Sequence, residues 1–160
     1  MTANRLGPYA NNRDESVFRF LGIPTVMRSS GESTNSAFAL MEHLAAPPGF
    51  ASPYHTHHLE DEAFYILSGN VSFVSDGKWL KAGPGTYVFG PREIPHGFKV
   101  TGDAPAQMLI LCAPAGFERF VLELSEPVDA PMTPPDIEKL VKTAAKYKID
   151  IHGPLPDEPE

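Results

Sequence analysis

The chain has 160 residues, a formal net charge of −7 and 42% hydrophobic residues. This length and composition predict one soluble globular domain with its own hydrophobic core. The negative charge argues against a nucleic-acid partner and against binding to an anionic membrane. The single cysteine, Cys112, cannot form an intrachain disulfide. Cysteine usage therefore favours a cytoplasmic protein.

The first 113 residues have the pattern of short β-strands separated by turns. Seventeen prolines and 13 glycines mark many of these turns. Short strands are expected at 16–21 and 24–27, a polar loop at 29–35, and a closely spaced series of strands from 36 to 113. No helical periodicity interrupts this series. The pattern therefore predicts an all-β sandwich or small barrel rather than a parallel α/β sheet.

The character of the chain changes after Pro114. A short helix is expected at 117–124, and a second at 136–147, where apolar residues recur at helical spacing. Thr133 is the expected N-cap of the second helix, with prolines in its first turn. The predicted organisation is an N-terminal arm with short strands packing on the barrel (1–35), a β-barrel (36–113), and a C-terminal helical extension and tail (114–160).

Four side chains in the strand series form a candidate metal site. His55 and His57 are two residues apart, so they point to the same face of a strand with Cα atoms about 6.6 Å apart. Glu62 shares a strand face with Phe64 in the next expected strand, and His96 begins a later one. If these strands are neighbours, three imidazoles and one carboxylate meet.

Such a donor set would bind one divalent transition metal and leave positions open for water, oxygen or substrate. Mixed nitrogen and oxygen ligands exclude a thiolate site and disfavour calcium, which prefers oxygen. Iron, manganese, nickel, cobalt, copper and zinc all remain open. Two further histidines, His43 and His152, are expected at the surface because they lie outside this spacing pattern.

The spacing of these residues resembles that of a known family. Gly49-x5-His55-x-His57-x4-Glu62-x6-Gly69 is similar to the first motif of the cupin superfamily at every position, and Gly85-x5-Pro91-x4-His96 is similar to the second. The chain departs from the second motif where Glu93 replaces the usual glycine and Val100 the terminal asparagine. The C-terminal segment also resembles single-domain, quercetinase-like bacterial cupins.

The resemblance implies a double-stranded β-helix, the jelly-roll barrel of cupins, with a metal in its mouth and frequent homodimers. It implies that His55, His57, Glu62 and His96 are the metal ligands. In the flavonol dioxygenases of this family the ligand glutamate also acts as a base toward the substrate hydroxyl. The resemblance assigns that role to Glu62.

Apolar side chains on the inner strand faces are the candidate lining of a substrate pocket: Phe38, Phe64, Ile66, Phe73, Phe98 and Met108. An aromatic barrel mouth suits a flat phenolic or enolic small molecule. The first hypothesis is therefore a quercetin 2,3-dioxygenase-like oxidoreductase. A metal-dependent isomerase, cyclase or decarboxylase that needs no oxygen, and a non-catalytic small-molecule-binding protein, remain alternatives because one fold carries many chemistries.

Overall fold

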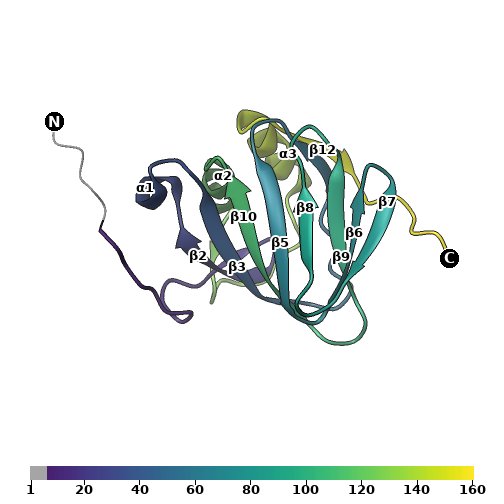
Figure 1. The fold of residues 1–160 in the computed structure, drawn as a ribbon, viewed down its shortest axis with the longest axis horizontal. Coiled ribbons are helices and arrows are strands. Elements are labelled where there is room, and N and C mark those ends of the chain that lie inside the picture. Colours follow the sequence, from purple (N-terminus) through teal and green to yellow (C-terminus); the bar gives the residue numbers. More distant parts are fainter. Residues whose placement is uncertain (1–6) are drawn as a thin grey trace.

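The computed structural model describes residues 7–160 and contains two antiparallel β-sheets that enclose a common core (Figure 1). The seven-stranded sheet has the order β11 (Glu126–Pro127), β1 (Phe18–Phe20), β2 (Ile23–Ser29), β3 (Ala39–Ala46), β10 (Ala106–Ala113), β5 (Asp61–Ser68) and β8 (Tyr87–Gly90). The five-stranded sheet has the order β12 (Ile149–Gly153), β4 (Tyr54–His57), β9 (His96–Thr101), β6 (Asn70–Ser75) and β7 (Lys78–Ala82). The expected all-β jelly-roll fold is confirmed.

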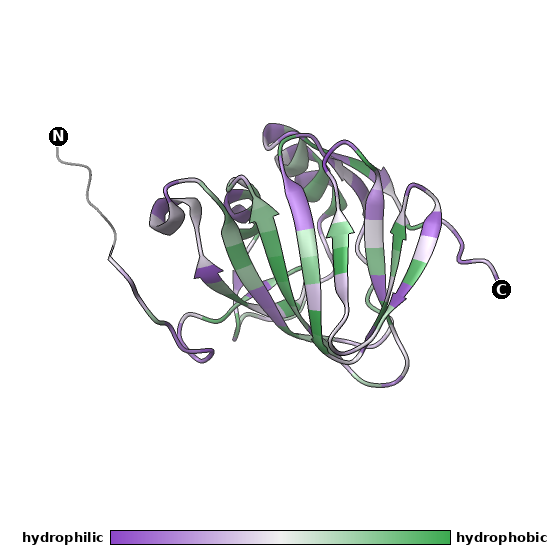
Figure 2. Ribbon diagram, in the orientation of Figure 1, coloured by the Kyte–Doolittle hydropathy of each residue, from purple (hydrophilic) through white to green (hydrophobic). Residues whose placement is uncertain are grey.

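Alternation of burial along the strands explains why the two sheets pack face to face. In β10, Met108, Ile110 and Cys112 are buried while the residues between them are only half-buried. Apolar bands alternate with polar ones along several strands (Figure 2). The inward-pointing side chains of both sheets interdigitate to form the core. Phe64 from one sheet contacts Phe73 from the other, with ring centroids 4.8 Å apart.

The β6–β7 hairpin follows directly from its turn residues. Asp76 and Gly77 have φ of 49° and 73°, which is the geometry of a type I′ turn. This turn has the twist that matches the flanking strands, and Ser75 pairs with Lys78 across it. The sequence signal for this hairpin is therefore confirmed.

Three helices accompany the sheets among the described residues: α1 (Gly31–Thr34), α2 (Phe117–Glu123) and α3 (Ile137–Lys146). The one-turn helix α1 replaces the loop that was expected at 29–35. It forms because Ser30 and Ser33 make a reciprocal capping box. Helix α3 is capped by Asp136, which accepts a hydrogen bond from the Lys139 backbone, and not by Thr133 as predicted.

Parts of both terminal segments join the sheets. Strand β2 pairs with β3 in one sheet, and β12 pairs with β4 in the other, so that Ile151 lies opposite His55. Helices α2 and α3 lie at the same end of the barrel (Figure 1). The N-terminal arm predicted within 1–35 lies partly outside the described residues, and the division of the chain into three segments stays a prediction. No helix in the described part of the chain has the length and apolar content to span a membrane.

Candidate metal centre

Three histidines from the five-stranded sheet face one glutamate from the seven-stranded sheet. Strand β4 carries His55 and His57, and β9 begins at His96, which pairs in register with His55. Glu62 comes from β5, where it lies between Cys112 and Gly90 of the neighbouring strands. The four side chains therefore meet between the two sheets, as the spacing predicted.

The donor atoms are close enough to share one ion. One ligand atom from each of the four residues lies within 4.8 Å of all the others. The Glu62 Oε2 atom is 2.7 Å from His96 Nε2, 3.3 Å from His57 Nε2 and 3.9 Å from His55 Nε2. All three imidazoles thus point the same ring nitrogen at one carboxylate oxygen.

Two of the other ring nitrogens donate to backbone carbonyl groups that hold their imidazoles in place, and the third lies near a carboxylate. His55 Nδ1 donates to the Pro53 carbonyl oxygen at 2.7 Å, and His96 Nδ1 donates to the Ile94 carbonyl oxygen at 3.0 Å. His57 Nδ1 lies 3.4 Å from Glu60 Oε2. A proton held on Nδ1 leaves the Nε2 lone pair free for a metal, and such acceptors commonly support histidine ligands.

Buried polar atoms without partners indicate that the cluster fits a metal ion. Among the described residues, neither ring nitrogen of His57 has a hydrogen-bond partner, and both are buried. Buried polar atoms are ordinarily satisfied, so unpaired ones need an explanation. Three neutral imidazole nitrogens and a carboxylate are a common donor set for a divalent transition metal. The chemistry of the residues therefore fits the ion that the sequence predicted, without deciding which metal it is.

Electrostatics in the cluster favour an ionised carboxylate. Burial alone would raise the pKa of Glu62, but the positive charge of His57 and the contacts with the three imidazoles hold that pKa well below its usual range. Burial also opposes the charging of His57, yet the carboxylates of Glu62 and Glu60 raise its pKa to about 9. Burial lowers the pKa of His55. The site thus attracts positive charge to its centre.

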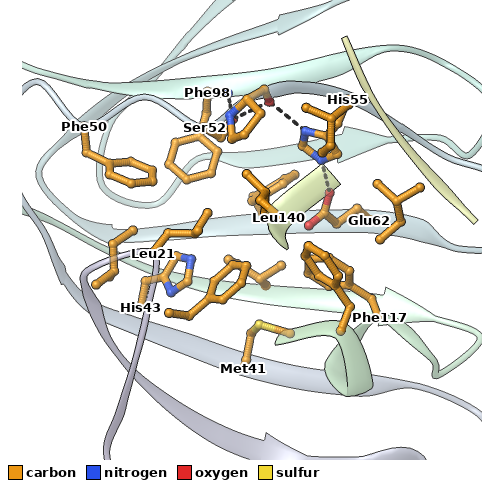
Figure 3. A pocket seen from close by; sticks show the side chains of 18 residues that line it. Leu21, Met41, His43, Phe50, Ser52, His55, Glu62, Phe98, Phe117 and Leu140 are labelled. Carbon is orange, nitrogen blue, oxygen red and sulfur yellow. Dashed lines mark hydrogen bonds and ion pairs between the residues drawn. The ribbon is translucent and has the colours of Figure 1, made fainter. Parts of the chain in front are cut away.

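A cavity of about 60 Å³ lies beside the cluster (Figure 3). Its polar side chains are His43, Ser52, His55 and Glu62. The rest of its lining is apolar: Phe20, Leu21, Ile23, Met41, Phe50, Pro53, Phe64, Phe98, Ile110, Phe117, Phe120, Leu140, Ile149 and Ile151. The arrangement places a cluster that could hold an ion at one end of an apolar chamber.

The predicted pocket residues lie in different places. Phe64 and Phe98 line the cavity. Ile66, Phe73 and Met108 are buried in the barrel core and do not line it. Phe38 is half-buried just before β3 and does not line it. Whether any of the six contacts a substrate stays a prediction.

His43 was expected at the surface because it lies outside the spacing pattern, but this prediction is wrong. It is 3% exposed and lines the cavity. On β3 it shares a face with Met41, which is fully buried, because residues two apart in a strand point the same way. The two-residue spacing between Met41 and His43 is the sequence signal that could have predicted this burial. His152 is exposed, as expected.

Sequence reasoning also missed Glu60 and most of the cavity wall. Glu60 is 3% exposed, although it stands in a run of three acidic residues. Phe20 from β1, Phe117 from α2 and Leu140 from α3 enclose the chamber, although all three lie outside the two spacing motifs. Nothing local in the sequence marks them, because their place depends on where distant segments pack.

Comparison with known proteins is consistent with this geometry. Residues 43–112 match the family model of the cupin domain. A dimethylsulfoniopropionate lyase, DddQ, from Ruegeria pomeroyi is 38% identical over 66 residues, which are 41% of this chain and 32% of the lyase. This chain therefore matches about a third of the length of that curated relative.

Solved structures share the barrel. A predicted oxalate decarboxylase from Thermotoga maritima is 28% identical with a TM-score of 0.51, over 57% of this chain and 80% of that protein. A Cupin 2 conserved barrel domain protein from Salinispora arenicola is 22% identical with a TM-score of 0.57, over 73% of this chain and 98% of that protein. The second of these likenesses is evidence for the fold alone.

Proposed function

Because this chain belongs to the cupin superfamily, we propose that it is a metal-dependent dioxygenase that acts on a small phenolic or enolic molecule. One divalent transition metal per chain would be held by His55, His57, Glu62 and His96. The observation that carries the proposal is the convergence of three Nε2 atoms on Glu62 Oε2 at one end of an apolar cavity. When bound, the ion supplies a Lewis acid for an anionic substrate oxygen and, if it is redox-active, an electron route to dioxygen.

Glu62 is the candidate proton acceptor for a substrate hydroxyl. It is 4% exposed, and its low pKa keeps it ionised while the imidazoles contact Oε2. A carboxylate held in this way is a weak base. It would take a proton only after exchanging some of these contacts for the substrate hydroxyl. The base role therefore requires Glu62 to move within the cluster.

The size of the chamber restricts what can reach the cluster. Its volume of about 60 Å³ is well below the roughly 300–1,000 Å³ of typical ligand pockets. An apolar surface cleft of about 490 Å³ adjoins it. The two share the residues Leu21, Phe50, Ser52, Pro53, Leu140 and Ile151. We infer that the reacting end of a substrate enters the chamber while an apolar or aromatic body occupies the cleft.

Oxygen consumption tests the proposal directly. Protein loaded separately with iron, manganese, nickel, cobalt or copper is mixed with a panel of flavonols and 1,3-diketones, and oxygen uptake is followed with an electrode. At least one metal should give uptake, and Glu62→Gln should lower it at least about a hundredfold, a typical range for a general base. Metal content measured on the same samples separates loss of the base from loss of the ion. No uptake with any combination would refute the dioxygenase.

A second candidate is a lyase or decarboxylase that needs no oxygen. The similarity to a dimethylsulfoniopropionate lyase over 66 residues favours it. In that case the metal, zinc included, would polarise a carboxylate or carbonyl of the substrate and Glu62 would remove a proton. Turnover under strict anaerobiosis separates the two reactions, because only the dioxygenase loses activity without oxygen.

We also propose a homodimer formed through the outer face of β5 and β8. Tyr65, Leu67, Tyr87 and Phe89 are exposed there, and Tyr65 pairs with Tyr87 across the two strands. Exposed aromatic patches of this kind commonly mark protein interfaces. Light scattering should give twice the chain mass for the wild type and a lower mass for Tyr87→Lys. The exposed Leu80 on the other sheet provides the control substitution, Leu80→Lys.

A further inference from the structure

A second buried histidine lies in the wall of the chamber, apart from the metal-donor cluster. His43 on β3 is 3% exposed and lines the same cavity as His55 and Glu62. Figure 3 shows His43 beside Leu21 and Met41, at a different end of the cavity from His55 and Glu62. A buried polar ring among apolar side chains is costly unless a polar group meets it.

The hydrogen bonds of Thr25 determine which nitrogen of His43 carries the proton. Thr25 Oγ1 is 2.9 Å from the Ile23 carbonyl oxygen, which can only accept. The hydroxyl has a single proton and donates it there. Thr25 Oγ1 is also 2.9 Å from His43 Nδ1. With the hydroxyl proton donated to Ile23, the hydroxyl accepts in this contact and Nδ1–H donates. The Nε2 atom of a neutral His43 is then left with an unprotonated lone pair.

The surroundings keep His43 neutral and its ring fixed. Burial lowers the pKa of His43 to about 4, and the Glu62 charge only partly opposes this. The ring of Phe20 stacks on it, with centroids 6.4 Å apart and planes inclined by 20°. At neutral pH the imidazole is therefore an orientated hydrogen-bond acceptor rather than a cation.

The remaining polar side chain of the cavity wall is already engaged. Ser52 Oγ accepts a hydrogen bond from the Phe98 backbone at 2.9 Å and donates to the Pro53 carbonyl oxygen at 3.1 Å. Among the described residues, no side chain or backbone donor bonds to His43 Nε2. Outside the metal-donor cluster, His43 Nε2 is thus the polar side-chain atom of this wall that is available to a ligand.

We propose that His43 is a positioning residue that accepts a hydrogen bond from the substrate. The geometry points to a small bifunctional molecule. An anionic oxygen would face the metal-donor cluster, and a hydroxyl or N–H group a few atoms away would donate to His43 Nε2. This inference rests on the proposed metal-dependent function and narrows its substrate to enols, phenols or acids that carry a second donor. An analogue without that donor leaves Nε2 unpaired and binds more weakly.

Matched ligand pairs test the inference on zinc-loaded protein. The probes are 3-hydroxypropanoate against propanoate and 4-hydroxybutanoate against butanoate, whose carboxylate supplies the anionic oxygen. Dissociation constants come from chemical-shift titrations of backbone amides. For at least one chain length the hydroxylated acid should bind about five- to tenfold more tightly, the worth of one neutral hydrogen bond. His43→Leu should reduce this preference to about onefold. Met41→Leu, which alters the same wall without a polar atom, should retain it.

Nuclear magnetic resonance of the imidazole nitrogens determines the tautomer of His43 independently of any ligand. In wild-type protein, with or without zinc, Nδ1 of His43 should carry the proton and Nε2 should not. Thr25→Val removes the acceptor and should weaken this preference without removing the ring. An Nε2–H tautomer in the wild type would overturn the inference. So would a hydroxyl preference that is absent in the wild type or unchanged in His43→Leu. Failure to take up zinc would instead count against the proposed function, and the tautomer would still be read on the metal-free protein.

Discussion

The two ends of the cavity are built in opposite ways. At the metal-donor end, four polar side chains from β4, β5 and β9 converge within 4.8 Å. The apolar lining brings together side chains of β1, β3, α2, α3 and β12, from nearly the whole length of the chain. The four donors come from three strands within residues 55–96, whereas the apolar lining depends on how remote segments pack. The apolar lining is therefore the part of the cavity that the spacing motifs do not determine.

The largest expected effect is loss of the ion when one donor is removed. His96→Gln should weaken zinc binding by more than about a hundredfold, beyond the 10- to 100-fold that is typical for an outer partner of a ligand. Competition with a chromophoric chelator measures this. His152→Gln, at an exposed histidine that contacts Thr56, should bind zinc like the wild type. Equal affinities for the two variants would show that the donor end is not a metal site.

Acid should destabilise the folded protein through the buried imidazole of His43. The unfolded chain binds a proton at this residue near pH 6.5, but the folded protein resists protonation until about pH 4. Stability from this group is therefore present above pH 6.5 and is lost as the pH falls toward 4. Urea unfolding with a chelator present should show the wild type losing about 3 kcal/mol more than His43→Leu between pH 7 and pH 4. Parallel losses in the two proteins would contradict the buried neutral imidazole.

Removing one apolar residue of the cavity wall should lower stability but leave zinc binding nearly unchanged. Leu140 on α3 is 5% exposed and lines the cavity. Leu140→Ala should lower the free energy of unfolding by about 2–3 kcal/mol through lost burial and the space left behind. Val141→Ala, whose residue is 44% exposed, should cost under about 1 kcal/mol. Zinc affinity should stay within about threefold in both, since the donor end is formed by other elements. A large loss of zinc affinity in Leu140→Ala would show that the two ends are coupled.

The smallest expected effect concerns the carboxylate behind His57. Glu60→Gln keeps an acceptor oxygen for Nδ1 but removes the charge, so zinc affinity should fall toward the lower end of the 10- to 100-fold range. Glu93→Gln serves as the control, because Glu93 contacts His58 at the surface. Calorimetric titration of both variants with zinc gives the comparison. An unchanged zinc affinity in Glu60→Gln would show that Glu60 does not contribute to metal binding.

The barrel and the shared strand face of His55 and His57 were predictable because their signals are local. Residues two apart in a strand share a face, so His55 and His57 could be placed together without a structure. Turn residues marked the hairpins, and Asp76-Gly77 adopts the expected conformation. At the position where the motif has glycine, Glu93 takes a φ of 67°, so here the fold imposes a conformation that the residue itself disfavours.

Other features depended on competition between neighbouring residues. Asp136 and Thr133 can both cap a helix. Asp136 does so because α3 begins at Ile137, after the two prolines rather than around them. The apolar face predicted for this helix is buried only in part. Leu140 and Ala144 are buried, whereas Ile137 and Val141 remain exposed. Helical periodicity identifies a face but not how much of it a partner covers.

The sequence by itself determined the strand pattern, the turns and the shared strand face of His55 and His57, because each depends on residues close together in the chain. Only the tertiary structure decided that β12 pairs with the strand of His55, that Glu60 lies beside His57 and that His43 lines the chamber. Those three outcomes depend on which remote segments pack together. Burial of a polar group is a property of its surroundings, which come from elsewhere in the sequence.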